Sequence, residues 1–512
     1  MNSARKNLPI PVVFGVADED LSSTVARETA AARLAQTRWS ATPVEQRLLL
    51  VRELRHLIAE QARELAEASA AQRGRPTSES LTAEVLPLAE ACRFTERHAK
   101  RVLAPKRHGL RGRPAWLMGV RSEIHREPFG VVLVIGPGNY PLFLPGVQVI
   151  QALVAGNAVL LKPAPDGVAA AKALRELILR AGFAPELLAL LPADTEAVRA
   201  AIAARPDKVI FTGSAATGET ILAQLAPHLI PAAMELSGCD AALVRADADL
   251  DLTVRALAFG LRLNSGATCL SPKRAFVHCS VATELEGRLA QEFNGSGRQH
   301  LGNHCVTGPG ADRLRPLLEN ALALGAHFLA GGLREDGSIE APVVLAGVSP
   351  NAGMLEEDVF LPVLALVTVA DDHEAVLRLN RCPFALGASI FTRDESVAPE
   401  LAARINAGTV SVNDLIVPTA DPRLPFGGCK RSGFGATRGA EGLLELTRPK
   451  VVTLTRGAFR PAFDPPQPGD ADLIGYYLRV AHGRCFQTRL RSLISLIRNA
   501  LHRQRIYTQE SP

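Results

Sequence analysis

Hydrophobic residues recur at helical spacing through the first hundred residues of the chain. Between about residues 20 and 100, Val51, Leu54 and Ile58 stand three or four positions apart among Arg and Glu, and Leu81–Arg101 repeats the pattern. Side chains at this spacing lie on one face of a helix. The pattern therefore predicts amphipathic helices over this part of the chain.

A long uncharged stretch follows. Residues 128–161 contain no charged side chain. Hydropathy alone would suggest a membrane span, but glycine and proline interrupt the stretch repeatedly over residues 136–146. We interpret it as a buried strand at Val131–Ile135, a loop, a buried helix, and a second strand at Ala158–Leu161.

Strand and helix patterns then alternate. A helical pattern at Ala169–Ala181 is followed by a strand at Leu187–Leu191, a helix at Thr195–Ala204 and a strand at Lys208–Phe211, and a second alternating series occupies residues 241–391. Strands separated by helices of ten to fifteen residues are typical of βαβ units. The expected fold class is therefore α/β with parallel sheets.

The C-terminal part is different in character. Residues 448–456 predict a further strand, and a Pro-rich linker at 461–469 leads to a tail with seven Arg and no acidic residue between Leu473 and Gln509. The apolar tail positions that would share a helical face over two stretches are Leu473, Ile474, Tyr477, Leu478, Leu490, Leu493, Ile494, Ile497 and Leu501, with Arg479, Arg489, Arg491, Arg498 and Arg505 among the polar positions. Such a basic amphipathic tail predicts either peripheral contact with an anionic membrane or packing on the enzyme's own surface.

Composition narrows the class of protein. The chain of 512 residues is 47% hydrophobic and 21% charged, which excludes bulk disorder and coiled coil, and its formal charge of +5 is too small to indicate a nucleic-acid partner. Eight Cys without close pairing predict neither a disulfide framework nor a metal site. Residues 1–6 are not followed by an apolar core, so we expect no signal peptide and a cytoplasmic location.

Two turns carry candidate binding chemistry. Phe211-Thr212-Gly213-Ser214 joins a predicted strand to a helix that contains Gly218, a geometry that directs backbone N–H groups at an anion. Asn139 lies in a Gly/Pro loop, where it either caps a turn or donates its amide to a developing oxyanion. Each turn also has an ordinary structural interpretation when taken alone.

Two side chains are candidates for covalent and proton chemistry. Cys269 follows Gly266 and Thr268 on an apparent loop, where a thiolate would be exposed, whereas cysteines are more often buried and inert. Glu235 stands among apolar residues and is either a solvated edge residue or a buried carboxylate with a raised pKa that accepts a proton near neutral pH.

The order of these motifs identifies a family. Pro-x-Asn-Tyr-Pro at 137–141, Gly-Asn-Ala-Val-Leu-Leu-Lys-Pro at 156–163, Phe-Thr-Gly-Ser at 211–214, Glu-Leu-x-Gly at 235–238 and Gly-x-Thr-Cys at 266–269 resemble the NAD(P)-dependent aldehyde dehydrogenase superfamily. Segments 358–362, 387–391 and 424–433 match it too, and the resemblance covers about residues 20–456.

The resemblance implies a domain organisation. It predicts a Rossmann-like cofactor-binding domain with N-terminal helices (1–120 and 128–234), an α/β catalytic domain (235–425), a small β oligomerisation arm (121–127 and 447–456), a return segment to the cofactor domain (426–446) and the linker and tail outside it (457–512). The arm implies a homodimer formed by strand addition between subunits.

The resemblance also assigns roles. Cys269 would attack the aldehyde to give a thiohemiacetal and then a thioester, Asn139 and the Cys269 backbone N–H would hold the oxyanion, and Glu235 would activate the hydrolytic water. The cofactor would be NAD or NADP. The residues implied to bind it are Lys162, Gly213, Ser214, Gly218, Asp358 and Phe360.

Some positions depart from the family pattern. Pro165 stands where the family often has a Glu that binds ribose hydroxyls, so the choice between NAD and NADP stays open. Asp358 replaces the Glu of the usual Glu-x-Phe-Gly-Pro motif, with Glu357 beside it, and Leu361 replaces its Gly. Gly138 replaces a frequent Trp, which is expected to widen the substrate tunnel.

Three functions remain to be separated. The first is a hydrolytic dehydrogenase that converts an unidentified aldehyde to a carboxylic acid, which Glu235 favours because an enzyme that must spare its thioester gains nothing from a water-activating base. The second is a CoA-acylating or acyl-reducing relative. The third is an inactive scaffold tethered to a membrane, against which the trio of Asn139, Glu235 and Cys269 argues.

Overall fold

The computed structural model describes residues 20–71, 74–117, 119–294, 304–456, 463 and 465–509. Two compact units are present: residues up to 107 with 123–452 form the first, and residues 108–122 with those from 453 onward form the second. Several predictions fall on residues outside this set. They concern residues 1–6 at the N-terminus and residues 461, 462 and 464 of the predicted Pro-rich linker.

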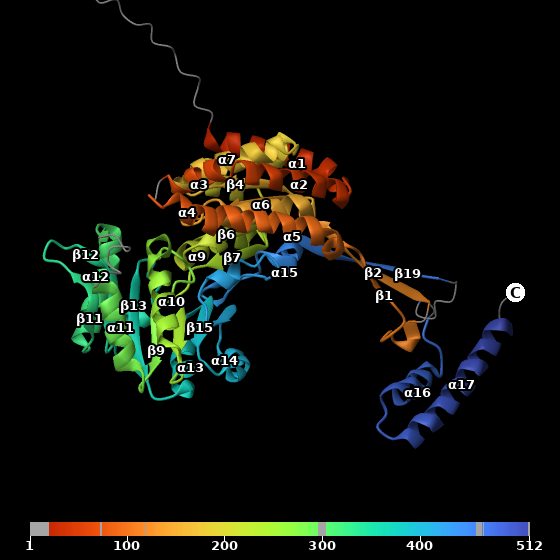
Figure 1. Ribbon diagram of the computed structural model, residues 1–512. Coiled ribbons are helices and arrows are strands. Elements are labelled where there is room, and N and C mark those ends of the chain that lie inside the picture. The colour runs from red at the N-terminus through yellow and green to blue at the C-terminus, as the bar shows by residue number, and fades with distance from the viewer. Residues whose placement is uncertain are drawn as a thin grey trace, which may run out of the picture. The chain divides into compact units, whose positions relative to one another are not determined.

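The predicted N-terminal helices are confirmed. They are α1 (Leu21–Ser40), α2 (Val44–Glu60), α3 (Ala62–Ala70), α4 (Thr77–Ser80), a π-helical turn (Leu81–Val85) and α5 (Leu86–Leu103). Helix α5 buries Leu88, Ala91, Cys92, Thr95 and Ala99, which are spaced by one helical turn. In Figure 1 these helices gather beside the first sheet.

The first sheet has the strand order β18-β7-β6-β3-β4-β5. Its parallel strands are β3 (Val131–Ile135), β4 (Ala158–Lys162), β5 (Leu188–Leu190), β6 (Lys208–Gly213) and β7 (Ala232–Leu236), connected by α6 (Phe143–Ala155), α7 (Val168–Arg180), α8 (Thr195–Ala203) and α9 (Ala215–Leu225). The chain runs outward from β3 to β5 and then returns to β6 on the other side of β3. The crevice beyond the carboxyl ends of β3 and β6 is thus a topological switch point, where α/β sheets bind ligands.

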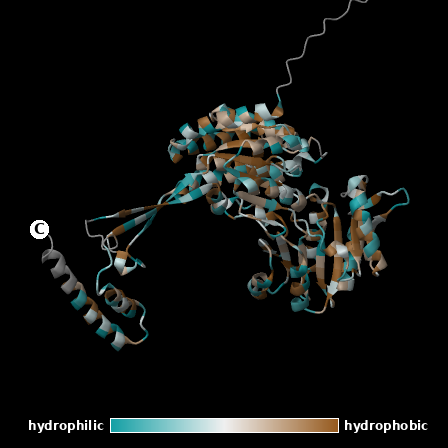
Figure 2. Cartoon of the chain, turned by 180° about the vertical axis from the view of Figure 1, so that it is seen from behind, coloured by the Kyte–Doolittle hydropathy of each residue, from teal (hydrophilic) through white to brown (hydrophobic). Residues whose placement is uncertain are grey.

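The second alternating series forms its own sheet, in the order β10-β12-β13-β9-β8-β15-β16 with β11 beside β12. Its strands are β8 (Ala241–Val244), β9 (Arg274–His278), β10 (His304–Val306), β11 (His327–Leu333), β12 (Ile339–Ala346), β13 (Val363–Val369), β15 (Gly387–Phe391) and β16 (Thr409–Val412). The helices are α10 (Leu250–Arg262), α11 (Ala282–Asn294), α12 (Pro309–Ala323), α13 (Asp372–Arg381) and α14 (Ala398–Arg404). Hydrophobic strands mark the centres of both sheets in Figure 2, which confirms the α/β class.

The boundary between the sheets lies later than the sequence suggests. Strand β7 continues to Leu236, two residues past the expected limit at 234, because it pairs with β6 as far as Leu236. The segment 426–446 supplies β17 (Cys429–Lys430, paired with β14 at Phe384–Ala385), β18 (Gly433–Phe434) and α15 (Gly439–Glu445), and β18 pairs antiparallel with β7. Gly433 has φ +101°, and a Cβ there would lie 1.9 Å from the Met234 carbonyl oxygen, so this pairing requires glycine.

Three strands form a separate small sheet in the order β1-β2-β19: β1 (Lys106–His108), β2 (Val120–Pro128) and β19 (Thr447–Thr455). In the second unit, α16 (Asp470–His482) and α17 (Phe486–Gln509) contact each other as a helical hairpin, so the two helical stretches expected in the tail are present. None of the helices in the described part of the chain combines the length and apolar content needed to cross a bilayer.

Candidate active site

Most of the predicted site residues meet in one cavity of about 280 Å³ at the switch point of the first sheet. The predicted residues that line it are Asn139, Gly213, Ser214, Glu235, Cys269, Asp358 and Phe360. Lys162 and Gly218 do not line this cavity: Lys162 ends β4, and Gly218 lies within α9, where a Cβ would be 2.8 Å from a Leu236 methyl. Residues far apart in sequence thus come together as the motif order implied.

Cys269 lies on a strained loop. Asn264 and Ser265, which precede it, have φ values of 50° and 52°, and Gly266 at φ +74° packs so closely on Pro362 that a Cβ would lie 2.5 Å from the Pro362 Cα. Cys269 is half-buried on this loop, so the exposure expected from the sequence is partial. Burial, with the nearby Glu235 charge, raises the pKa of Cys269 to about 12, so its thiol is protonated near neutral pH.

Cys269 also lines a second, larger cavity. This space of about 490 Å³ is bounded mainly by apolar side chains, among them Leu86, Phe143, Phe259, Ile416 and Phe426. We call it the apolar cavity, and we call the first one the polar cavity. Because Cys269 lines both, the two cavities meet at this residue.

Glu235 is buried at the end of β7. Its Oε2 accepts a hydrogen bond of 3.0 Å from the Thr437 hydroxyl, while its Oε1 has no partner among the described residues. Burial raises the pKa of Glu235, and the charge of Arg438 and the Thr437 hydrogen bond oppose that shift. A buried carboxylate with one free oxygen and a raised pKa suits a general base.

Asn139 is held against the cysteine loop. Its side-chain Nδ2 donates to the Ala267 carbonyl at 3.1 Å, and its own carbonyl accepts from Asn264 Nδ2 at 2.9 Å and Arg75 Nη1 at 3.3 Å. The amide therefore contacts the loop that carries Cys269, although the two residues are far apart in the sequence. It donates to a protein carbonyl in this structure, so it must exchange that bond to serve an oxyanion.

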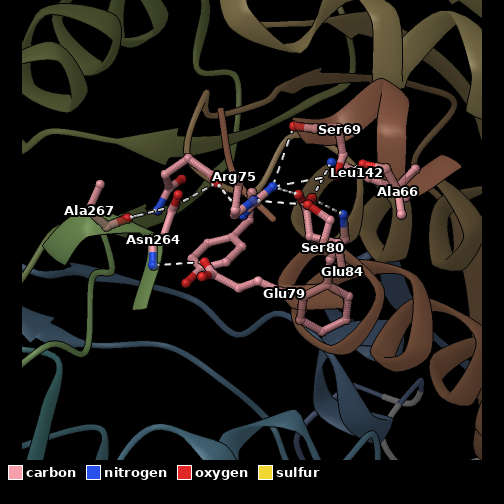
Figure 3. Close-up of polar contacts among 12 residues, drawn as sticks. Ala66, Ser69, Arg75, Glu79, Ser80, Glu84, Leu142, Asn264 and Ala267 are labelled. Carbon is pink, nitrogen blue, oxygen red and sulfur yellow. Dashed lines mark hydrogen bonds and ion pairs between the residues drawn. The ribbon is translucent and has the colours of Figure 1, made fainter. Parts of the chain in front are cut away.

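A buried ion pair supports the Asn139 loop from behind. Arg75 pairs with Glu84, and its Nε donates to the Ser80 hydroxyl at 3.1 Å. Glu84 Oε2 accepts from the backbone N–H groups of Leu142 and Phe143 at 2.7 and 3.1 Å. Figure 3 shows this cluster, in which the guanidinium of Arg75 lies among Ser69, Ser80 and Glu84. This one ion pair thus holds both ends of the loop: Arg75 bonds to Asn139 at its start, and Glu84 bonds to Leu142 and Phe143 at its end.

The lining of the polar cavity carries groups that suit part of a dinucleotide. Ser214 caps the N-terminus of α9 and accepts from Thr217 N at 3.3 Å, a helix end suited to phosphate. Asp358 accepts from the Ser237 hydroxyl through Oδ2, but its buried Oδ1 has no partner in the described chain. Ribose hydroxyls are donors of the kind that this orphaned oxygen requires. Lys273 Nζ, bonded to the carbonyls of Gly266 at 3.0 Å and Leu361 at 2.8 Å, joins the cysteine loop to the Asp358 segment.

Sequence reasoning missed several residues of this site. Thr437 and Arg438 lie just beyond the matched signature segment, and Arg75, Glu84 and Lys273 carried no motif. For Arg438 the sequence offered one signal of a possible site residue, a charged side chain within the Gly-rich segment 423–439. No local signal marks the other four, because their burial depends on tertiary packing.

Comparison with known proteins decides the family. The model of the aldehyde dehydrogenase family matches residues 12–452. The chain belongs to the aldehyde dehydrogenase family. It is similar to 4,4'-diapolycopene aldehyde oxidase of Methylomonas sp, with 32% identity over 81% of this chain and 79% of the relative.

Two further relatives bear on the cofactor. The aldehyde dehydrogenase is similar to succinate semialdehyde dehydrogenase [NAD(P)+] of Escherichia coli (strain K12), with 32% identity over 81% of this chain and 89% of that protein. The solved NAD-dependent aldehyde dehydrogenase of Sinorhizobium meliloti matches with a TM-score of 0.78 and 29% identity over 86% of this chain and 89% of that one. The chain is therefore an NAD(P)-dependent aldehyde dehydrogenase that oxidises an aldehyde to an acid, as the motifs indicated.

Proposed function

We propose that this aldehyde dehydrogenase works hydrolytically through Cys269, Asn139 and Glu235. The observation that carries the proposal is the place of the Cys269 sulfur, at the junction of the apolar and polar cavities with Glu235 on the polar side. The bound nicotinamide cofactor supplies the hydride acceptor. Ser214, Asp358 and Phe360 would hold that cofactor in the polar cavity.

The chain's own groups would act in sequence. The Cys269 thiol gives its proton to solvent and its sulfur bonds to the aldehyde carbon as the carbonyl π electrons move to oxygen, while Asn139 Nδ2 turns from the Ala267 carbonyl to the developing oxyanion. After oxidation a thioester remains on the sulfur. Glu235, through its free Oε1, takes a proton from water, and the resulting hydroxide displaces the Cys269 thiolate to give the acid. The free carboxylate oxygen favours water over CoA as the acyl acceptor.

The substrate class follows from the apolar cavity. A volume of about 490 Å³ bounded by Leu, Ile, Val and Phe side chains fits an aldehyde with an extended apolar body better than a small hydrated one. The name of one relative, 4,4'-diapolycopene aldehyde oxidase, refers to an aldehyde with such a body. We therefore propose an aldehyde on a long apolar chain as the substrate.

An aldehyde panel tests this function. Reduced-cofactor absorbance would be followed with NAD+ and NADP+ for aldehydes from two to twelve carbons, and kcat/KM should rise with chain length because each buried methylene contributes about 0.8 kcal/mol. Cys269→Ala should lose activity by several orders of magnitude. Cys429→Ala, which alters a half-exposed thiol outside both cavities, is the matched control. Substantial turnover by Cys269→Ala would refute the nucleophile, and a preference for two-carbon substrates would refute the substrate class.

We further propose that two copies of the chain form a homodimer through β19. This strand is at one end of its three-stranded sheet, and Val451, Val452 and Leu454 are 64%, 44% and 55% exposed. An exposed apolar edge strand is a template for strand addition. Light scattering at micromolar concentration should give the mass of a dimer for the parent chain. The Val452→Pro variant, which disrupts the edge strand, should give the mass of a monomer. A monomeric parent chain would contradict the proposal.

For the tail we propose peripheral contact with an anionic membrane surface, within the cytoplasmic location that the sequence predicts. Apolar side chains of the hairpin stay exposed, including Ile474 at 58%, Ile494 at 62% and Leu501 at 58%, and no acidic residue accompanies its Arg between 473 and 509. Basic residues near anionic lipid contribute about 1 kcal/mol each. The full chain should float with phosphatidylserine vesicles at low salt and a chain ending at residue 456 should not. Equal behaviour of the two forms would contradict membrane contact.

A further inference from the structure

Arg438 is a buried cation in the wall of the apolar cavity. Its exposure is 7%, and it lies at the start of α15 with φ 63°. Nearly all other side chains of this wall are apolar or uncharged. Glu90, the other charged residue of the wall, pairs with Arg93 at 3.4 Å. The cavity wall therefore holds a single cation that forms no close ion pair within the described residues, although the charge of Glu235 acts on it through space.

The guanidinium is held in place by neighbours that leave part of it free. Nη1 donates to the Thr419 carbonyl at 2.7 Å, and the guanidinium carbon lies 4.0 Å from the centre of the Phe426 ring and 5.3 Å from that of Phe143. Nε is buried without a hydrogen-bond partner, and Nη2 donates to none of the described residues. Two aromatic rings and one carbonyl thus fix the plane of a side chain whose remaining donors are unused.

Such an arrangement is costly unless an acceptor arrives. A buried charge with few acceptors is destabilising, and burial lowers the pKa of Arg438, a shift that the charges of Glu235 and Cys269 oppose. Glu235 attracts Arg438 electrostatically, but no hydrogen bond or ion pair joins the two side chains, and the bonded oxygen of Glu235 is engaged by Thr437. An acceptor that enters the cavity would therefore stabilise the guanidinium further.

We propose that Arg438 binds a carboxylate of the substrate, so that the preferred substrates are oxo acids, in which an apolar chain carries both the aldehyde and a carboxylate. A fixed guanidinium whose Nη2 is not used by the protein matches a carboxylate in charge and offers it a hydrogen-bond donor. This inference rests on the proposed function, since it assumes that the apolar cavity holds the aldehyde. It adds an anionic group to the substrate class that the cavity volume alone suggests.

Matched substrate pairs test the proposal on the unaltered enzyme. Butanal and 4-oxobutanoate form one pair, and decanal and 10-oxodecanoate form the other, so that each pair differs by a methyl against a carboxylate. In at least one pair kcat/KM should favour the oxo acid by about 10- to 100-fold, the range that hydrogen bonds to a charged group provide. Absence of a carboxylate preference in both pairs would overturn the proposal.

Two variants locate the preference. Arg438→Met should abolish the ratio of kcat/KM between the members of the favoured pair, and Arg438→Lys should retain part of it because the charge remains. A preference that survives in Arg438→Met would overturn the proposal. An equal loss of kcat/KM for both members of the pair, together with a displaced pH profile, would also overturn the proposal. In that case Arg438 would act by shifting the pKa values of Glu235 and Cys269. If no aldehyde is oxidised by the parent enzyme, the proposed function fails as well, whereas oxidation without a carboxylate preference refutes only this inference.

Discussion

Arg75→Met should destabilise the enzyme strongly. The side chains of Arg75 and Glu84 are 2% and 0% exposed, and Arg75 is the only cation paired with this carboxylate in the described chain. Removing Arg75 leaves Glu84 buried and ionised without a cation, with two backbone N–H donors, or forces it to take up a proton. Breaking a buried ion pair in this way costs about 3–5 kcal/mol of unfolding free energy.

Two further variants separate charge from packing. Arg75→Met combined with Glu84→Gln removes both charges and keeps an oxygen that accepts from Leu142 and Phe143, so it should recover at least half of the loss. Arg63→Met breaks the Arg63–Glu67 pair on the solvent side of α3, where the two side chains are 82% and 54% exposed, and should change stability by at most about 1 kcal/mol.

The assay is guanidinium chloride unfolding followed by circular dichroism, with kcat measured on the same preparations. Activity should fall with stability in Arg75→Met, because the Asn139 carbonyl loses one of its donors. The reasoning is refuted if Arg75→Met loses less than about 1 kcal/mol. It is equally refuted if the double variant is no more stable than the single one, since the isolated charge would then not be the cause.

Three other predictions concern the active site and its support. Alkylation of Cys269 by iodoacetamide, followed by mass spectrometry, should rise about tenfold per pH unit from pH 7 to 9, because the thiolate is a minor form well below its pKa of about 12; a plateau in that range would contradict it. The steady-state rate of aldehyde oxidation should fall as the pH falls through the raised pKa of Glu235, because the protonated carboxyl cannot act as a base. In Glu235→Gln this acidic limb of the pH–rate profile should be absent, and the residual rate should not depend on pH over the same range. Gly433→Ala should lower the denaturation midpoint by an amount equivalent to about 1–3 kcal/mol because its Cβ would meet the Met234 carbonyl, whereas Gly287→Ala, where nothing lies within 4 Å, should not lower it.

The sheets were predictable because their strands are short runs rich in apolar residues, separated by segments with helical periodicity. Val131–Ile135 coincides with β3, and the expected strand at residues 448–456 differs from β19 by one residue at each end. The limit placed at residue 234 failed, since β-pairing with β6 and β18, which no local pattern records, extends β7 to Leu236.

The polar support of the site was not predictable from the sequence. Glu84 lies in an amphipathic helical pattern where a carboxylate is usually solvated, and it is buried because the N-terminal helices pack on the loop that begins at Asn139. Arg438 is covered by the rings of Phe143, which is remote in the sequence, and of Phe426, which lies twelve positions before it. The half-buried state of Cys269 likewise depends on contacts made after folding.

The central claim is that Cys269 carries the acyl group that Glu235 helps to hydrolyse, and acyl trapping tests it most directly. The Glu235→Gln enzyme would be mixed with decanal and NAD+ or NADP+, quenched in acid within a second, digested and examined by mass spectrometry. The account predicts one burst of reduced cofactor and a decanoyl group on the peptide that contains Cys269, absent from Cys269→Ala. Cofactor reduction with no acyl group on that peptide, or with the group on another cysteine, would contradict it.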